Sequence, residues 1–169
     1  YLFNLDSVFA KEYTFSVQNT LESLLSIVIP ISTPDERHLN LKEWIKESLN
    51  LGIQVILVHD SVNKNEEGII DVLVENFISS NFVFVRGRFG SPGAARNAGK
   101  VEVKNKWLAF WDSDDHPKPN EFYEMVILGE SKGVDAVVGG FAEVSSTTGE
   151  QIRTNKPDSI SDLAINPGL

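Results

Sequence analysis

The acidic segment Asp112-Ser113-Asp114-Asp115 is the part of the sequence best suited to chemistry. Three carboxylates within four residues repel one another unless a cation or hydrogen-bond donors compensate their charge. Ligand atoms that are all oxygen suit Mg²⁺ or Mn²⁺, which usually keep waters and share their coordination shell with substrate phosphates. The alternative is a solvated turn in which one aspartate caps the following helix. An EF-hand loop is excluded, because its glycine and its distal glutamate are missing.

Asp60 and Arg96 are two further candidates. Asp60 ends an apolar run, where it either forms a turn or cap or points at hydrogen-bond donors of a ligand. A glycine-rich turn at residues 87–93 leads into a helix whose backbone amides can face an anion. Arg96, on that helix, pairs with a diphosphate or with the acidic segment, or is a surface charge. The turn matches neither a P-loop nor GxGxxG, so ATP hydrolysis and nicotinamide binding find no support.

Other catalytic centres are not supported. The three histidines, at positions 38, 59 and 116, lack the spacing of zinc ligands, and no nucleophile-elbow motif is present. His116 flanks the acidic segment, where it either contacts a metal or phosphate or is solvated. The absence of cysteine excludes disulfides, thiolate zinc sites and cysteine nucleophiles, and it favours a cytosolic location.

Strands alternate with helices along the chain. Apolar runs predict strands at 26–30, 53–58, 81–85, 107–111 and 136–138, followed by a hairpin from 141. Helical spacing of apolar residues predicts helices near 41–49, 70–77 and 94–100, and one that ends near 132. This order predicts an open, mainly parallel α/β sheet flanked by helices. Ligands of such sheets bind beyond the carboxyl ends of the strands, so Pro30, Asp60 and the acidic segment should share one edge.

Length and charge set the remaining limits. The 169 residues suffice for one domain, expected at 25–156, with an N-terminal extension at 1–24 that can pack on it as a helix and an irregular tail at 157–169. A net charge of −9 argues against general nucleic-acid binding, so a phosphorylated ligand would be bound locally. No run approaches the roughly 18 apolar residues of a spanning helix, and the first residues do not resemble a signal peptide. A soluble protein of the cytoplasm is expected.

Four motifs, in order, resemble a family 2 glycosyltransferase with the GT-A fold. The family pattern runs S-I-I-I-P, V-D-D-G-S, N-x-G-x-x-x-A-R-N-x-G and F-L-D-S-D-D, and the resemblance spans about residues 25–145. The matching segments here are Ser26-Ile27-Val28-Ile29-Pro30, Asp60-Ser61, Gly90-Ser91-Pro92-Gly93-Ala94-Ala95-Arg96-Asn97-Ala98-Gly99 and Phe110-Trp111-Asp112-Ser113-Asp114-Asp115.

The resemblance implies a nucleotide-diphosphate sugar as donor, most often a UDP-sugar. Pro30 and Ser32 match the segment that packs around the nucleobase and ribose. Asp60 matches an aspartate that hydrogen-bonds the base, and Arg96 matches an arginine near the donor. The implied acceptor is a hydroxyl group of a glycan, lipid or other molecule, and the implied location is the cytoplasm or, through peripheral association, the inner face of a membrane.

The resemblance also implies a divalent metal, Mn²⁺ or Mg²⁺. Asp112 and Asp114 fall on the D-x-D positions that hold ribose and metal, and Asp115 is a further candidate metal ligand. A metal bridging both phosphates would neutralise the charge that develops on a diphosphate leaving group.

Two positions near the expected nucleobase site depart from the family pattern. His59 stands where the family usually has aspartate. Ile31-Ser32-Thr33 replaces V-Y-N, which removes an aromatic platform and leaves the identity of the nucleobase open.

The catalytic base is the part of the family pattern that the chain does not match. Inverting members use a carboxylate base on the acceptor hydroxyl, and no residue after Asp115 matches it. The base is therefore expected beyond Leu169, the last residue of the sequence, and no catalytic residue is assigned. The sequence predicts a glycosyltransferase shortened at its C-terminus or, as the alternative, a catalytically silent nucleotide-sugar-binding or interaction module. A nucleotidyltransferase would need a glycine-rich arginine loop after the first strand, and a receiver domain would leave the acidic segment unexplained.

Overall fold

A computed structural model describes residues 2–4, 24–32, 41–61, 67–75, 77–145 and 147–155. The strands are β1 (Leu2–Asn4), β2 (Leu25–Ile31), β3 (Gln54–Asp60), β4 (Phe82–Gly87), β5 (Trp107–Phe110), β6 (Ala136–Val137), β7 (Phe141–Val144) and β8 (Gln151–Asn155). The helices are α1 (Leu41–Asn50), α2 (Glu67–Val74), α3 (Pro92–Lys100) and α4 (Pro119–Lys132).

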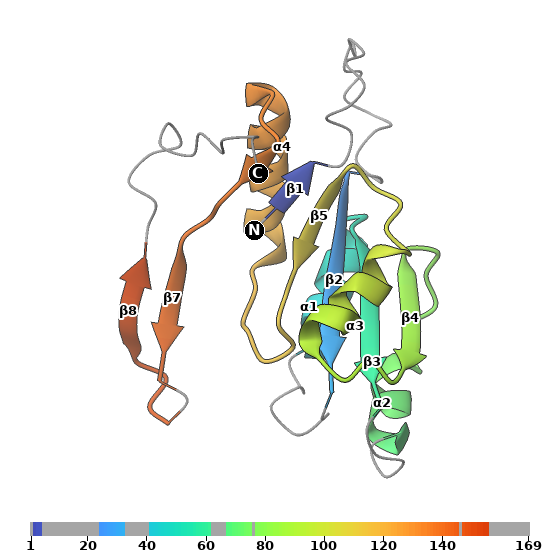
Figure 1. The fold of residues 1–169 in the computed structure, drawn as a ribbon. Helices are drawn as coiled ribbons and strands as arrows, with labels where there is room; N and C mark the ends of the chain where they lie inside the picture. The colour runs from blue at the N-terminus through green and yellow to red at the C-terminus, as the bar shows by residue number, and fades with distance from the viewer. Residues whose placement is uncertain are drawn as a thin grey trace.

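Six strands form one sheet in the order β4-β3-β2-β5-β1-β6, while β7 and β8 form a separate hairpin (Figure 1). β2 runs parallel to β3 and to β5, and β3 runs parallel to β4. β1 is antiparallel to both of its neighbours. The predicted α/β sheet, mainly parallel and flanked by helices, is therefore confirmed.

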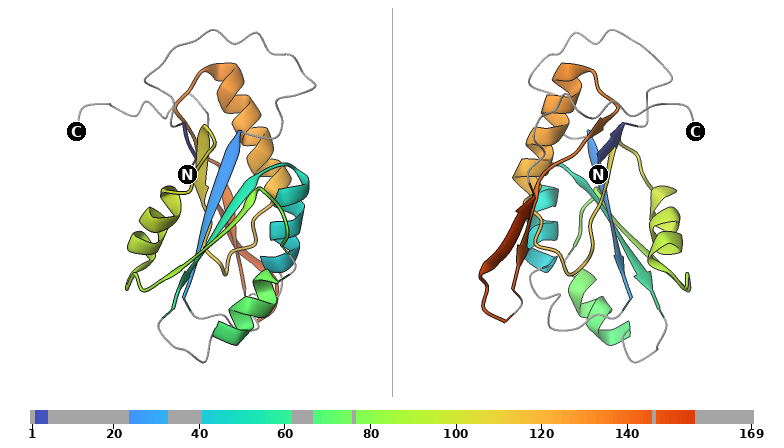
Figure 2. Two further views of the ribbon diagram at one scale, coloured as in Figure 1. Left: turned by 90° about the vertical axis from the view of Figure 1, so that its right-hand side faces the viewer. Right: turned by 60° about the vertical axis from the view of Figure 1, so that its left-hand side comes forward.

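Helices cover both faces of the sheet (Figure 2). One face carries α1, α2 and α4, and the other carries α3. Alternate residues of β2 divide between these layers, since Ile27 and Ile29 belong to the larger core while Val28 packs with Ala95 of α3. Because both faces are covered, the four parallel strands carry continuous apolar runs, which is the pattern that the sequence shows.

Gly99 allows α3 to lie close to the sheet. A Cβ atom at this position would come within 2.5 Å of Val28 Cγ1 and 2.7 Å of Val58 Cγ2. Only hydrogen fits in that space, so the glycine sets how near α3 approaches β2 and β3. The same helix carries Arg96, one turn before Gly99.

The N-terminal segment differs from the expectation. Residues 2–4 form β1 inside the sheet, paired with Trp107–Ala109 and Ala136–Val137, and are not an extension outside the domain. Three residues are too few to show a periodicity, and their pairing with distant strands determines their structure. The helix expected within 1–24 and the irregular tail at 157–169 lie outside the described residues.

Other boundaries shift by a few residues. β3 continues to Asp60, so His59 and Asp60 belong to the strand, and α2 begins at Glu67, earlier than predicted. The predicted hairpin is confirmed. Within the part of the chain that the structure describes, no helix is both long and apolar enough to cross a membrane.

Candidate functional site

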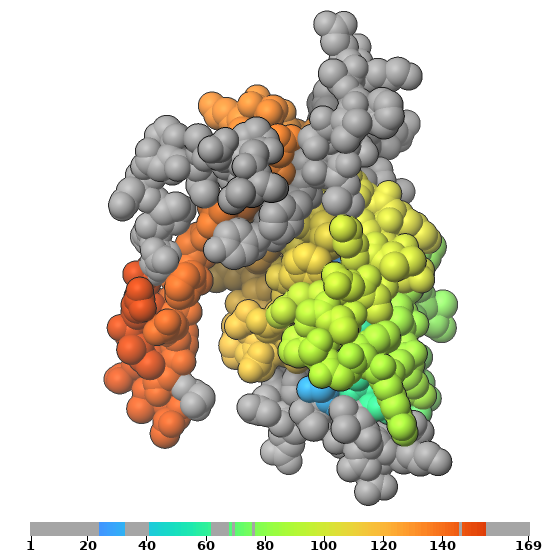
Figure 3. All heavy atoms as spheres, viewed as in Figure 1, coloured from blue at the N-terminus to red at the C-terminus, as the bar shows by residue number. Residues whose placement is uncertain are grey.

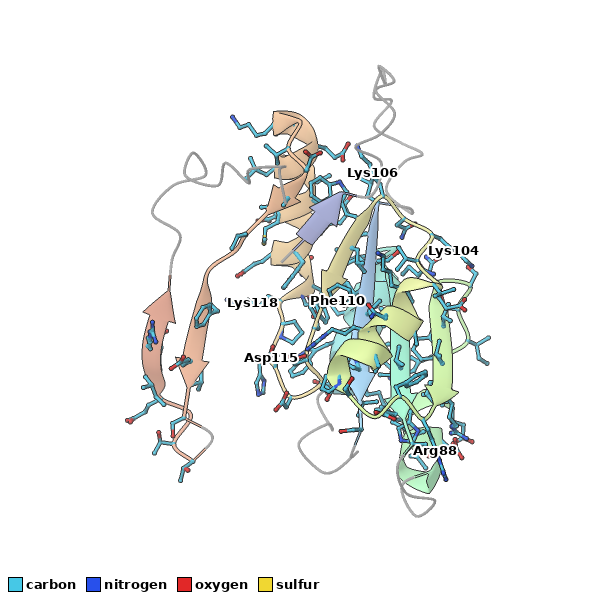
Figure 4. The ribbon with its side chains drawn as sticks, viewed as in Figure 1. Arg88, Lys104, Lys106, Phe110, Asp115 and Lys118 are labelled. Atoms are coloured by element: carbon cyan, nitrogen blue, oxygen red, sulfur yellow. The ribbon has the colours of Figure 1, made fainter. Side chains whose placement is uncertain are left out.

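The carboxyl ends of the parallel strands meet at one edge of the sheet, as predicted. Pro30 of β2 stands beside Val58, and Ile31 beside His59, in the register of β2 with β3. Figure 4 shows Arg88, which follows β4, and Asp115, which follows β5, at this edge, whereas Lys104 and Lys106 lie at the opposite edge. The candidate ligand-binding residues therefore come from the ends of different strands and from the segments that follow them.

Asp60 fixes the loop that leads into α3. Its two carboxylate oxygens accept hydrogen bonds from the backbone N–H groups of Phe89, at 2.7 Å, and Gly90, at 2.9 Å. The side chain is almost fully buried, and Ser61 continues the pairing through a bond from its N–H to the carbonyl of Gly87 at 2.8 Å. Asp60 thus holds the glycine-rich turn in place, which corresponds to the turn-forming or capping role considered from the sequence. Its remaining lone pairs can still accept hydrogen bonds from a ligand.

The turn itself depends on Gly90, whose φ of +73° lies in the left-handed region that residues with a side chain rarely adopt. Ser91 then caps α3 by accepting a hydrogen bond from the N–H of Ala94 at 3.2 Å, and Pro92 occupies the first helical position. The N-terminus of α3 therefore has a defined start at the same edge as Asp60.

Arg96 pairs with the acidic segment. Its Nη2 donates to an Oδ1 atom of Asp112, and both side chains remain partly exposed, at 31% and 53%. In Figure 3 the loop that follows β5 lies beside α3 on the surface. Of the alternatives for Arg96, the ion pair with the acidic segment is the one that the structure contains.

The acidic segment forms a tight turn at the end of β5. The N–H of Trp111 donates to the carbonyl of Val28 at 3.1 Å and extends the sheet, and the N–H of Asp115 donates to the carbonyl of Asp112 at 3.1 Å. Partial burial of the carboxyl group, followed by the negative charges of Asp112 and Asp114, raises the pKa of Asp115. A cation placed here would offset the cost of burying this carboxylate and also its repulsion by Asp112 and Asp114.

The carboxylate oxygens of the acidic segment suit a hard cation that also binds a ligand. Among the described residues, no group of three histidine or acidic side chains is arranged to hold a metal ion unaided. Mg²⁺ commonly binds through one or two carboxylates together with waters and substrate phosphates, and Mn²⁺ accepts the same oxygen ligands. Because Arg96 engages Asp112, Asp114 and Asp115 are the carboxylates that fit this mode.

The remaining predicted residues lie at the same edge. Pro30 is half-buried within β2, and Ser32 follows this strand and is exposed. The structure thus brings Arg96 to Asp112 and Asp60 to the turn before α3, while Pro30 and Ser32 lie near Asp60 through the pairing of β2 with β3.

One contact at the site was not anticipated. Trp44 of α1 packs edge-on against His116, with ring centroids 4.9 Å apart and an interplanar angle of 70°. The helical spacing of apolar residues grouped Trp44 with the core, and nothing in that pattern marked His116 as its neighbour. Glu47, one turn after Trp44, accepts a hydrogen bond from Asn120 at 2.8 Å.

This chain is similar in sequence to parts of longer proteins. The chain is 26% identical over 156 residues to the uncharacterized glycosyltransferase RC0461 of Rickettsia conorii, covering 88% of this chain and 24% of the relative. It is 34% identical over 62 residues to the succinoglycan biosynthesis protein ExoO of Rhizobium meliloti, covering 37% of this chain and 18% of that protein. The chain thus spans about a quarter or less of the length of these relatives.

The predicted position of the catalytic base is not tested by the structure. The described residues end at position 155, before the last residue of the sequence, Leu169. A base beyond Leu169 therefore stays a prediction, and the residues of the edge described above are candidates for binding the donor, not for deprotonating the acceptor.

A solved structure and a family model also match this chain. The crystal structure of S. aureus TarS superposes with a TM-score of 0.50 at 18% identity, over 65% of this chain and 20% of that chain, which shows a shared fold. The family model described as glycosyl transferase family 2 matches residues 26–166, which include all four strand ends of the site. This chain therefore belongs to glycosyl transferase family 2.

Proposed function

We propose that this domain binds the nucleotide-diphosphate sugar donor of a glycosyl transfer reaction at the carboxyl edge of its sheet. The observation that carries the proposal is the meeting, at this edge, of Arg96 and the turn from Asp112 to Asp115. A diphosphate needs positive charge, and the chain as a whole carries a net charge of −9. The positive charge must therefore be local, from Arg96 and from a cation that the acidic turn attracts.

Each part of the edge has a proposed role. Asp114 and Asp115 would hold Mg²⁺ or Mn²⁺. When bound, the metal ion would neutralise the charge on the leaving diphosphate. Asp112 orients Arg96 toward the same region and is proposed to contact the ribose. On the other side, Pro30 and Ser32 at the end of β2 are proposed to pack around the nucleobase and ribose.

Asp60 is proposed to serve the nucleobase in two ways. Its hydrogen bonds hold the turn before α3 in place, and a lone pair left on its carboxylate accepts a hydrogen bond from the base. UDP is the nucleotide that the family resemblance favours.

The acceptor is proposed to be a hydroxyl group of a growing glycan, since the name of the Rhizobium meliloti relative refers to succinoglycan biosynthesis. Lipid and other hydroxyl acceptors are the competing classes. Location in the cytoplasm, or at the inner face of a membrane, stays a prediction from the sequence.

Calorimetric titration tests the proposal. UDP, GDP and CDP are titrated into the protein with Mn²⁺ and again with EDTA, and one of them is expected to bind at least about tenfold more tightly with Mn²⁺. Asp114→Asn should remove this gain. Glu124→Gln removes the same charge from an exposed position on α4 and serves as the control. Equal affinity with and without the metal would refute the metal site, and no binding of any of the three nucleotides would refute the proposed function.

A further inference from the structure

The segment between the acidic turn and α4 has few backbone bonds of its own. Within the described part of the chain, the N–H of His116 donates no backbone hydrogen bond, and Pro117 has no N–H to donate. Backbone bonding resumes at α4, where Glu121 and Phe122 donate to the carbonyl of Lys118 at 3.0 and 3.3 Å. Side-chain contacts therefore contribute to the position of the segment between Asp115 and α4.

Helix α1 provides such contacts from one side. Its residues Leu41, Ile45 and Ser48 are buried. Trp44 and Glu47 lie three residues apart, so they share an adjacent face of the same helix. Trp44 meets the ring of His116, and Glu47 binds Asn120 in the first turn of α4. Two residues of α1, one turn apart, thus contact the segment that follows the acidic turn.

We propose that Trp44 is a positioning residue, which holds His116 and thereby keeps the neighbouring Asp115 in place for the cation and the diphosphate. The proposal rests on the proposed function above. Aromatic rings packed edge to face attract each other beyond the area that they bury. Without this contact His116 would sample more conformations, and binding of the cation would have to restore the order that Trp44 supplies beforehand. Trp44 would therefore affect ligand affinity without touching the ligand.

The competing explanation is that Trp44 only stabilises the core. The two explanations predict different results for two variants of α1 that lose similar packing. Leu49→Ala shortens a partly buried side chain that packs on the same core, near the other end of α1, and is the matched control. Trp44→Leu removes the aromatic ring but keeps an apolar side chain, so that the variant folds. Trp44→Phe keeps an aromatic ring.

The first measurement needs no ligand. The ring current of Trp44 should displace the imidazole proton resonances of His116 in the NMR spectrum, which are assigned by their loss in His116→Asn. Trp44→Leu should move them toward the position of a solvated histidine, whereas Leu49→Ala should leave them unchanged. Resonances of His116 that are the same in the wild type and in Trp44→Leu would overturn the proposal.

The second measurement is the affinity for Mn²⁺ in the presence of UDP, obtained from the electron paramagnetic resonance signal of unbound Mn²⁺. Trp44→Leu should weaken it about two- to tenfold, the range that corresponds to an aromatic pair, and Trp44→Phe should recover most of the loss. Leu49→Ala should leave it unchanged. An unaltered affinity in Trp44→Leu would overturn the positioning role. If the wild type itself bound no Mn²⁺ with UDP, GDP or CDP, the proposed metal site would fail, and the NMR comparison would still decide whether Trp44 holds His116.

Discussion

Arg96, on the helix that follows the glycine-rich turn, donates a hydrogen bond to the carboxylate of Asp112, at the end of the strand beside it. The pair links α3 to the end of β5. Among the residues that the structure describes, neither Asp114 nor Asp115 forms an ion pair of this kind. Arg96 therefore has two tasks, because it neutralises Asp112 and places a guanidinium at the edge where a diphosphate is proposed to bind.

The first prediction concerns the charge of Arg96. Arg96→Gln should change the free energy of unfolding by less than about 1 kcal/mol, because partly exposed ion pairs contribute little. The affinity for a nucleoside diphosphate should fall about tenfold or more, since a hydrogen bond to a charged group contributes roughly 1.5–3 kcal/mol. Urea unfolding and calorimetric titration measure the two effects. Binding of the nucleoside without phosphates should not change.

Arg153→Gln is the control for this variant, because it removes the same charge from the exposed hairpin strand β8. If both variants weakened nucleotide binding equally, the effect would come from net charge and not from a contact of Arg96.

The second prediction concerns Asp60. Asp60→Ala leaves the N–H groups of Phe89 and Gly90 without their acceptor, so the free energy of unfolding should fall by about 2–3 kcal/mol. Asp60→Asn keeps one acceptor oxygen and should lose less. Unfolding in urea measures this loss, and a variant Asp60→Ala as stable as the wild type would show that the carboxylate does not hold the turn.

The strands and their shared edge could be predicted from the sequence because each strand is marked by its own run of apolar residues. Runs such as Ile53 to Val58 are apolar throughout, which is typical of strands covered on both faces, and the edge then follows from their parallel order. Residues 2–4 carry no such signal. They form a strand because β5 and β6 lie on either side to receive their hydrogen bonds.

The roles of single site residues depend on distant parts of the chain. Whether Asp60 is a cap or a ligand contact depends on where the amides of Phe89 and Gly90 lie, and those residues are 29 and 30 positions away. The same holds for Trp44, which has the helical spacing of a core residue but meets His116 after the chain has crossed the sheet. Spacing can indicate that a residue is partly buried, but it cannot identify the partner.

The third prediction is a pH dependence. Because the pKa of Asp115 is raised in the folded protein, the folded state binds this proton more tightly than the unfolded state does. The contribution of Asp115 to stability should therefore decrease as the pH rises from the ordinary aspartate value of about 3.9 through the raised pKa. Asp115→Asn removes this charge, so the variant should be more stable than the wild type at neutral pH, and the difference should shrink as the pH falls. Urea unfolding at a series of pH values without divalent metal measures it.

Glu124→Gln controls for the change in net charge, since Glu124 is exposed on α4. A stability difference between Asp115→Asn and the wild type that stayed constant with pH would contradict the assignment.

The last prediction tests how α3 positions Arg96. In Gly99→Ala the new methyl group would meet Val28 and Val58 of the sheet at 2.5 and 2.7 Å, so α3 must move outward. Overpacking of this kind typically costs about 1–3 kcal/mol, although alanine favours a helix over glycine by roughly 1 kcal/mol. Gly93→Ala, in the same helix, meets no atom within 4 Å and should be neutral or slightly stabilising. An outward shift of α3 would also separate Arg96 from Asp112, so Gly99→Ala should weaken nucleotide diphosphate binding while Gly93→Ala does not. If both glycine variants bound and unfolded alike, the close approach of α3 would not be what places Arg96 at the site.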